Sequence, residues 1–222
     1  APDIVFASTV AAGLLMPVFI SHTPLNFAGN IIALVYLLAL GTFFLILAGL
    51  DAGSAFGGMG SSREAIVVTL AEPAMILSIL AIALTAGSTN LSTIVHQSAL
   101  LEGMVLAPPA HLMALAAMFI VTLAETGRVP VDNPATHLEL TMIHEAMLLE
   151  YSGRYLALME WAAGIKLLVF LTLLVNVFAP WGIATTATPS ALAAGVAVYV
   201  VKVTGLAVII GMIESMFAKL RL

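Results

Sequence analysis

Six apolar segments dominate the sequence, and each approaches the length that a helix needs to cross a bilayer, about 20 residues. Only helices and closed barrels can span a membrane, and these segments lack the alternating pattern of barrel strands. Charged residues make up 9% of the chain, whereas a soluble domain has about a quarter. The sequence therefore predicts a single all-α integral membrane domain over residues 1–222, with spanning helices at Ile4–Ser21, Asn30–Leu50, Glu64–Ala86, Pro109–Glu125, Tyr155–Phe178 and Ser190–Ala218.

Glycine and proline residues mark where the predicted helices end. The stretch 51–60, DAGSAFGGMG, is rich enough in glycine to predict a turn. If the six helices alternate in direction, the loops 51–63 and 126–154 share one side of the membrane with the end of the chain. The opposite loops carry no basic residue, so the positive-inside rule assigns this side to the cytoplasm. It holds five of the seven basic residues: Arg63, Arg128, Arg154, Lys219 and Arg221.

Half of the chain's carboxylates lie between residues 120 and 160, namely Glu125, Asp132, Glu139, Glu145, Glu150 and Glu160. Ionisable groups are costly in a membrane protein, and a chain that keeps a cluster of them usually uses them. We expect a long cytoplasmic loop with a short interfacial or half-inserted helix between His137 and Glu150. A fully solvated helix is the alternative, but its apolar residues, Met142, Ile143, Met147, Leu148 and Leu149, leave too little polar surface for it.

Four further ionisable residues fall within predicted spanning helices: Lys166, Lys202, Glu72 and Glu214. Snorkelling to the interface suits Lys166 better than Lys202, which lies near the middle of its helix. Glu72 precedes Pro73, so the sequence predicts a carboxylate beside a kink. Two interpretations of Glu72 are open: it takes part in proton transfer, or it is a permanently protonated acid held by hydrogen bonds. Glu214 either joins the ion pathway or pairs with Lys219 at the interface.

Several kinds of site are excluded by the residues themselves. The chain has no cysteine, so it can ligate no iron–sulfur cluster through thiolates and form no disulfide. Nucleotide-binding glycine motifs and the GxSxG elbow are absent, and HEAML at 144–148 is not the HExxH of a zinc protease. We therefore expect no cofactor or metal bound by this chain, and no nucleic acid partner.

Three motifs resemble the family of respiratory complex I subunit 1 and its bacterial counterpart. LAETGRVPVD (123–132) resembles the AETNRxPFD motif, and LLEYSGRYLALMEWA (148–162) is similar to TEYSGxxFxLFFLAEYA. GSSREAIVVTLAEP (60–73) is similar to the LRxxAQxISYE region, with Glu72 at the motif glutamate. The stretch LAGLDAGSAFGGMGSSRE looks like the branch of hydrogenase-4 component C and formate hydrogenlyase. The resemblance covers almost the whole chain.

The sequence departs from the complex I pattern in the acidic loop. TMIHEAMLLE (141–150) is longer than its counterpart, so Glu145 has no secure equivalent. Ala135 and His137 stand where complex I has two acids, so the resemblance does not carry a quinone site over to this chain. Relative to the family's eight helices, we expect the second to the seventh here, without the terminal ones.

The resemblance implies a non-redox junction subunit of a membrane-bound oxidoreductase complex in a bacterial or archaeal cytoplasmic membrane. Its expected partners are cytoplasmic hydrogenase-like large and small subunits, which carry iron–sulfur clusters and a nickel–iron (NiFe) centre, and antiporter-like membrane subunits. Protons or sodium ions would move along the acids of the cluster together with Glu72, Lys166, Lys202 and Glu214. The cytoplasmic arm would contact Arg63, Arg128, Asp132, Tyr151 and Arg154.

Two other functions remain open from the sequence. One is a genuine complex I subunit that reduces quinone. The other is a stand-alone proton-coupled secondary transporter, which usually shows inverted repeats, and residues 1–110 and 111–222 show no convincing repeat. Within the acidic loop, Val129 and Pro130 stiffen the chain between Arg128 and Asp132, which predicts an ion pair between these two side chains.

Overall fold

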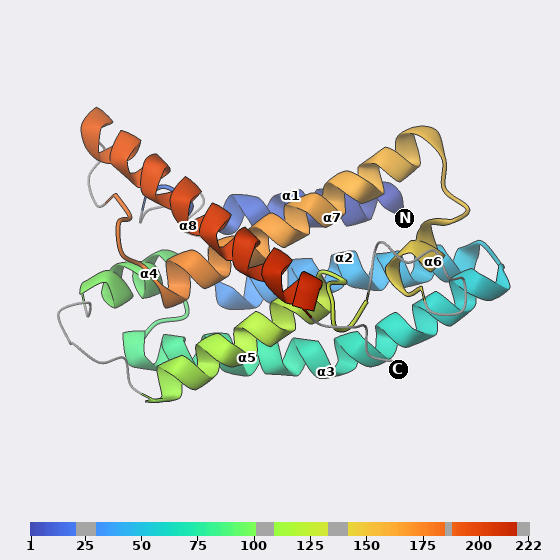
Figure 1. The fold of residues 1–222 in the computed structure, drawn as a ribbon, viewed down its shortest axis with the longest axis horizontal. Coiled ribbons are helices and arrows are strands. Elements are labelled where there is room, and N and C mark those ends of the chain that lie inside the picture. Colours follow the sequence, from blue (N-terminus) through green and yellow to red (C-terminus); the bar gives the residue numbers. More distant parts are fainter. Residues whose placement is uncertain (21–29, 101–108, 133–141, 185–187, 217–222) are drawn as a thin grey trace.

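Helices form nearly all of the computed structural model, which describes residues 1–20, 30–100, 109–132, 142–184 and 188–216 (Figure 1). No strand occurs in these ranges beyond two isolated bridges, Ile20 with Ala184 and Asn30 with Asn90. The elements are α1 (Pro2–Leu15), α2 (Ile31–Asp51), α3 (Ala55–Ala86), α4 (Leu91–Leu100), α5 (Pro109–Glu125), α6 (His144–Leu148), α7 (Gly153–Leu173), the π-helical turn η2 (Leu174–Phe178) and α8 (Pro189–Met216).

Side-chain caps and glycines set the helix ends. The Asn30 side chain accepts a hydrogen bond from the N–H of Ile32 at the start of α2, and Ser54 caps α3 through the N–H of Gly57. The helix α3 stops at Gly87, whose φ of 63° is the left-handed conformation that glycine adopts without strain. Short polar residues thus decide where the long apolar helices begin and end.

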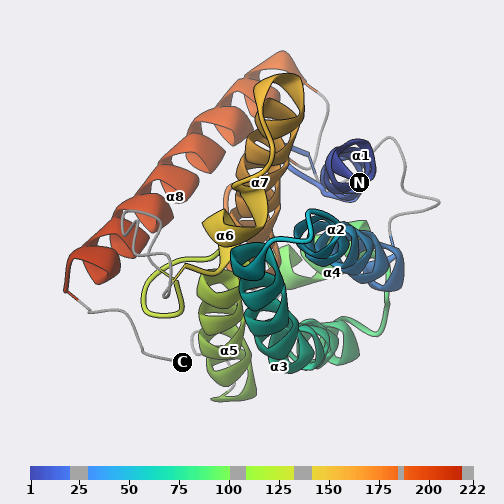
Figure 2. The same cartoon turned by 90° about the vertical axis from the view of Figure 1, so that its right-hand side faces the viewer.

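The helices pack side by side around one main core (Figure 2). α1 lies against α2 and α7, α3 packs along α5 and α2, and α6 contacts α3 and α2. The core includes fully buried side chains from α2, α3, α5 and α7, such as Leu34, Ile79, Met118 and Phe170. By contrast, α8 buries only Gly195, Lys202 and Ile210. It therefore crosses the outside of the bundle with most of its apolar surface uncovered.

Four helical segments are long and apolar enough to cross a membrane: Ile31–Asp51, Ala55–Ala86, Gly153–Phe178 and Pro189–Met216. The two other predicted spans are shorter apolar helices, α1 with 14 residues and α5 with 17. The first ends at Leu15 and not at Ser21, because Pro17 has no N–H to continue the helix and restrains the residue before it. An all-helical membrane fold is confirmed, while the count of six spans stays a prediction.

The predicted turn at 51–60 is wrong in its second half, because α3 begins at Ala55 and runs through the glycines. Close packing explains these glycines better than turn formation does. A Cβ atom on Gly57 would collide with the backbone carbonyl of Gly49, and one on Gly60 would lie 2.8 Å from the carbonyl oxygen of Ile143. Glycine therefore lets α3 approach α2 and the start of α6 more closely than any other residue could.

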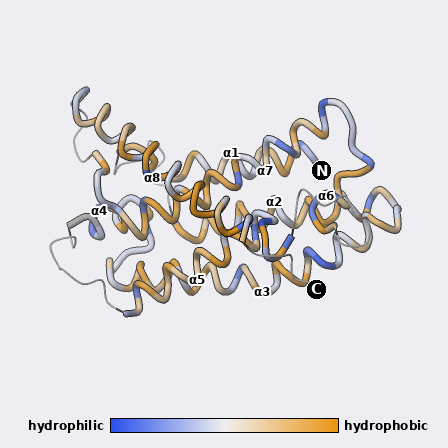
Figure 3. Tube along the Cα trace, in the orientation of Figure 1, coloured by the Kyte–Doolittle hydropathy of each residue, from blue (hydrophilic) through white to orange (hydrophobic). Residues whose placement is uncertain are grey.

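Two further differences concern the connections between spans. The expected loop 87–108 contains the helix α4, whose start is tied to α2 by the Ile31 N–H bonding to the Thr89 carbonyl. Within the acidic loop, the described helix is only α6, five residues long, and Ala146 and Met147 are buried. Figure 3 shows hydrophilic segments beside α6 and apolar positions along the middle of the bundle. The short helix is thus packed into the bundle and does not lie on its surface.

Candidate functional site: a buried row of ionisable groups

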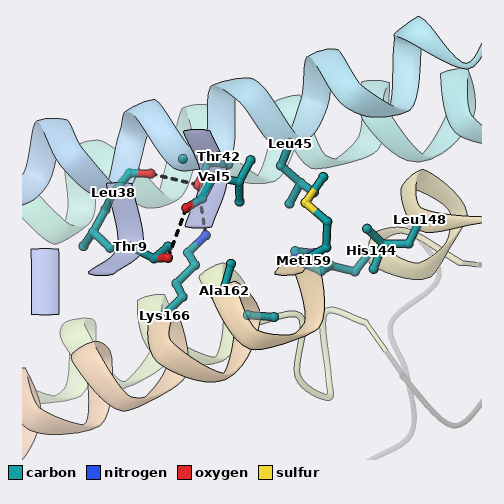
Figure 4. Close-up of a pocket in the computed structure, with 12 residues that line it drawn as sticks. Val5, Thr9, Leu38, Thr42, Leu45, His144, Leu148, Met159, Ala162 and Lys166 are labelled. Carbon is teal, nitrogen blue, oxygen red and sulfur yellow. Dashed lines mark hydrogen bonds between the residues drawn. The ribbon is translucent and has the colours of Figure 1, made fainter. Parts of the chain in front are cut away.

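Two buried ionisable side chains meet between α5, α7 and α2. The Lys166 ammonium lies 2.9 Å from the Glu125 carboxylate and donates a hydrogen bond of 3.0 Å to the Thr42 hydroxyl. Figure 4 shows Lys166 pointing from α7 toward Thr42. Glu125 is 3% exposed and Lys166 is 7% exposed, so both charges are removed from solvent. Their mutual attraction is what makes this burial tolerable.

A second buried acid, Glu64 on α3, lies near the first pair. One of its oxygens is 3.8 Å from Nδ1 of His144, at the start of α6. Glu64 is 2% exposed, and the charges of Lys166 and Asp132 also act on it. Asp132 in turn accepts hydrogen bonds from the backbone N–H groups of Ile143 and His144, which fixes the start of α6. The carboxylate of the loop therefore positions the histidine beside Glu64.

Glu72 lies on the same helix as Glu64, eight positions further on, which is about 12 Å along the axis. Its side chain is only partly buried, and the charges of Glu125 and Lys166 act on it. The α-helix continues through Pro73, so the predicted mid-helix carboxylate is present without a break in the helix. Glu72 thus extends the row on the side of Glu125 away from His144.

This arrangement can hold and exchange protons inside the bundle. Glu64, Glu125 and Lys166 come from three helices, and each lies close enough to another ionisable group to interact with it electrostatically. Removing one member of a buried pair costs about 3–5 kcal/mol, because the partner's charge is left uncompensated. Changing the protonation of one group therefore changes the preferred protonation of its neighbour. Coupling of this kind is what an ion relay requires.

Lys202 is on α8 and lies apart from this row. Its side chain reaches the turn that follows η2. Its ammonium donates hydrogen bonds to the carbonyls of Ala179 and Trp181, the second at 3.0 Å, and lies 4.8 Å from the centre of the Trp181 ring. His111 on α5 bonds to the Phe178 carbonyl at 2.9 Å. The two Lys202 contacts bond carbonyls of the turn that follows η2 and tie α8 to that turn.

The contacts of the Arg128 and Asp132 side chains lead in different directions. Arg128 donates to Glu214 near the end of α8 at 3.3 Å, and Asp132 accepts from the backbone before and at α6. Asp132 is buried, whereas Arg128 and Glu214 are partly exposed. The segment between Arg128 and Asp132 forms a compact turn, in which the N–H groups of Val131 and Asp132 donate to the Arg128 carbonyl. Each side chain holds a separate element to this turn.

The remaining predicted site residues lie closer to the surface. Glu150, Glu160 and Arg154 are exposed, and Glu145 and Arg63 are partly buried. Arg154 stacks over the Tyr155 ring with its guanidinium carbon 4.8 Å from the ring centre. Burial and the nearby charge of Asp51 raise the pKa of the Tyr151 hydroxyl, which therefore stays protonated at neutral pH. Glu139 lies outside the described residues, as do Lys219 and Arg221.

Three members of the row are not among the residues predicted from the sequence: Glu64, His144 and Thr42. The sequence places Glu64 only at the start of a spanning helix, because the glycines before it predict a turn. Its spacing of eight from Glu72 is a weak signal, since at 100° per residue the two side chains lie about 80° apart around the helix. Nothing in the sequence distinguishes His144 and Thr42 from ordinary loop and helix residues.

No group of three or more His, Cys, Asp or Glu residues in the described ranges is arranged to hold a metal ion. The paired charges of the row are instead acid–base partners of opposite sign.

Comparison with known proteins extends over the whole chain. Residues 1–222 match the sequence profile of a family described as NADH dehydrogenase. The chain is 36% identical over 218 residues to hydrogenase-4 component C of Escherichia coli, covering 98% of this chain and 67% of that protein. Formate hydrogenlyase subunit 4 of the same bacterium is 37% identical over 217 residues, with coverages of 96% and 67%. The chain thus spans about two thirds of the length of these relatives.

A solved structure has the same fold. It is a chain of the membrane-bound sulfane sulfur reductase, an archaeal respiratory membrane complex, with a TM-score of 0.81. The match covers 99% of this chain and 70% of the other, at 20% sequence identity. The resemblance predicted from the three motifs is confirmed by these similarities.

Proposed function

The chain belongs to the NADH dehydrogenase family of complex I-like membrane subunits, and from this we propose that it is the junction subunit of an energy-converting complex. In our proposal the complex is a nickel–iron hydrogenase or formate hydrogenlyase type. The subunit anchors the cytoplasmic redox arm and couples electron transfer to the movement of protons or sodium ions. Iron–sulfur clusters and the nickel–iron centre belong to partner subunits.

One observation carries the proposal: a lysine and a glutamate are paired inside the helix bundle, with two further acidic side chains nearby. A purely structural membrane subunit gains little from the Lys166–Glu125 pair, since apolar residues of similar size would pack there without the cost of desolvation. The similarity to hydrogenase-4 component C and formate hydrogenlyase subunit 4 supports the hydrogenase branch. We expect electron transfer in the redox arm to change the electrostatic potential at Glu64 and Glu125, and this change to move the ion along the row.

The direct test measures redox turnover and ion movement together in membrane vesicles that contain the complete complex. Lys166→Met and Glu125→Gln should abolish gradient formation while hydrogen turnover continues. Asp3→Asn is the control, because it removes an exposed carboxylate of α1 that is not among the predicted pathway residues. If both core variants build a gradient at the control rate, the coupling role is wrong. Repeating the assay without sodium, and with a protonophore, identifies the ion.

The alternative function is that of a complex I subunit that reduces quinone. The partner subunits distinguish this function from the hydrogenase type. Purification of the intact complex through a tag on this chain should recover a large subunit with paired CxxC motifs if the hydrogenase branch is right. Recovery of NADH-binding and flavin-binding subunits would support the quinone-reducing complex instead. A transporter of the stand-alone class should move ions when this chain alone is placed in liposomes, which our proposal does not expect.

A further inference from the structure

A small cavity lies between α1, α2, α6 and α7 (Figure 4). Its volume is about 30 Å³, and a buried water needs about 10–15 Å³ on this measure, so the cavity has room for about two waters. Most of the lining is apolar, but four residues bring polar atoms to it: Thr9, Thr42, His144 and Lys166. A site for ordered water needs both room and two to four polar partners, and this cavity offers both.

The lining residues of the cavity are spread along the helices. From α7 it is lined by Met159 and Lys166, seven positions apart, and from α2 by Leu38 and Leu45 with the same spacing. Seven residues of α-helix correspond to about 10 Å. Lys166 and Thr42 lie on one part of the wall, and His144 lies toward the other end, beside Met159 (Figure 4). The lining therefore includes both Lys166, which pairs with Glu125, and His144, which faces Glu64.

Polar atoms around this space are not satisfied by the described residues. Nδ1 of His144 is buried without a hydrogen-bond partner, and its distance of 3.8 Å from Glu64 is too long for a hydrogen bond. One carboxylate oxygen of Glu64 and one of Glu125 are also buried without a hydrogen-bond partner. Buried polar groups in proteins nearly always bond to protein or to ordered water. The row thus has acceptors and a ring nitrogen in place for a wider hydrogen-bonded connection.

We propose that ordered water in this cavity connects Lys166 to His144, and that His144 carries protons between the Lys166–Glu125 pair and Glu64. This inference rests on the proposed coupling function and adds a residue to it. In the transfer, Lys166 releases a proton to the water, and the water passes a proton to one ring nitrogen of His144. The other ring nitrogen releases its proton to the Glu64 carboxylate. Lys166 is then neutral. It is recharged when the Glu125 carboxylate takes up the next proton that enters the row and passes it on, so each cycle delivers one proton to Glu64.

Two variants test the two parts of this connection in the intact complex. His144→Gln keeps a side chain that can form hydrogen bonds but cannot be protonated at neutral pH. Ala162→Leu fills the cavity from α7, where Ala162 is buried against it. Ala157→Leu adds the same atoms to an exposed position on the same helix and serves as the control. Both test variants should lower protons moved per hydrogen turned over about tenfold or more, as loss of a proton-transfer group does, and the control should not.

Chemical rescue separates proton carriage from simple positioning. His144→Ala should uncouple the complex, and added imidazole should restore part of the gradient, because imidazole can carry a proton without being attached to α6. A residue that only holds α6 in place would not be replaced in this way. Unrescued loss of coupling, or wild-type coupling in His144→Gln and Ala162→Leu, overturns the inference.

A measurement on the unaltered complex covers the case in which variants fail to assemble. A map in which other buried waters are visible should show water density between Lys166 and His144, and its absence from such a map contradicts the inference. The outcomes also separate the two proposals. If Lys166→Met uncouples the complex while both cavity variants do not, only the role of His144 and its water falls. If Lys166→Met leaves coupling intact, the proposed function itself falls.

Discussion

The guanidinium of Arg128 and the carboxylate of Glu214 lie 3.3 Å apart, although 86 positions separate them in the sequence. Arg128 belongs to the turn that follows α5, and Glu214 to the last turn of α8. Because α8 buries few of its residues, this contact is one of the features that hold its end near the acidic loop. Loop and helix are therefore linked within the family motif LAETGRVPVD (123–132).

A double-mutant cycle on this pair should reveal coupling. Arg128→Ala and Glu214→Gln should each destabilise the chain slightly, and the double variant should lose less than the sum. The coupling free energy should be about 0.5–1 kcal/mol, because both side chains are partly exposed and screened. Unfolding of the detergent-solubilised protein with increasing SDS gives the four free energies. Strictly additive losses would show that the contact contributes nothing to stability.

Adjacent glycines in α3 should respond in opposite ways to alanine. Gly58→Ala meets no atom within 4 Å and should stabilise the helix by about 0.5–1 kcal/mol through its higher helix propensity. Gly57→Ala gains the same propensity but drives its Cβ into the Gly49 carbonyl, so it should destabilise the protein by about 1–3 kcal/mol. Thermal unfolding in one detergent compares the two. Equal effects would mean that α2 and α3 are not held this closely.

The Lys166–Glu125 pair should be more costly to break than to remove. Lys166→Met leaves Glu125 buried without its partner and should cost about 3–5 kcal/mol of unfolding free energy. Adding Glu125→Leu to that variant should recover most of the loss, since no charge then remains buried. Thr42→Val removes the hydroxyl that accepts from Lys166 and should cost only about 1 kcal/mol. A double variant less stable than Lys166→Met alone would contradict this account of the pair.

Lys202 should affect stability and not coupling. Lys202→Met removes charged hydrogen bonds to the Ala179 and Trp181 carbonyls and should cost about 1.5–3 kcal/mol. Hydrogen exchange should rise at the end of α7 and η2, which those bonds secure. Gradient formation per turnover should stay at the wild-type value in the complex that assembles. Uncoupling without a loss of stability would instead return Lys202 to the ion pathway.

The sequence is a good guide to the membrane helices because their length and apolar character are local properties. It also identifies Glu72, Glu125 and Lys166 as groups too costly to be incidental. The sequence does not show which side chains these groups contact. Lys166 and Thr42, for example, are 124 positions apart and meet only because α7 packs near α2. Composition alone also misjudges the glycines of 51–60, since glycine serves both turns and close helix contacts, and only the packed neighbours decide between the two uses.

The position of Lys202 illustrates a different limit. An intramembrane lysine suggests an ion pathway by its cost, yet here backbone carbonyls at the end of another helix accept its hydrogen bonds. The turn that carries these carbonyls has no sequence signature as clear as a charged residue. His144 escapes prediction for the opposite reason, because its importance comes from Glu64 and from Asp132, which lie in other segments.

The length of α3 has a mechanical consequence. Its 32 residues extend about 48 Å at 1.5 Å per residue, while the hydrocarbon layer is about 30 Å thick. Even a tilt of about 40° leaves the helix several ångströms too long for this layer. Glu64 and Glu72 both precede Pro73, where the helix loses a backbone hydrogen bond and bends most easily. Because Glu64 and Glu72 belong to one continuous helical segment, a displacement of the end of α3 that contacts α6 would move both carboxylates together.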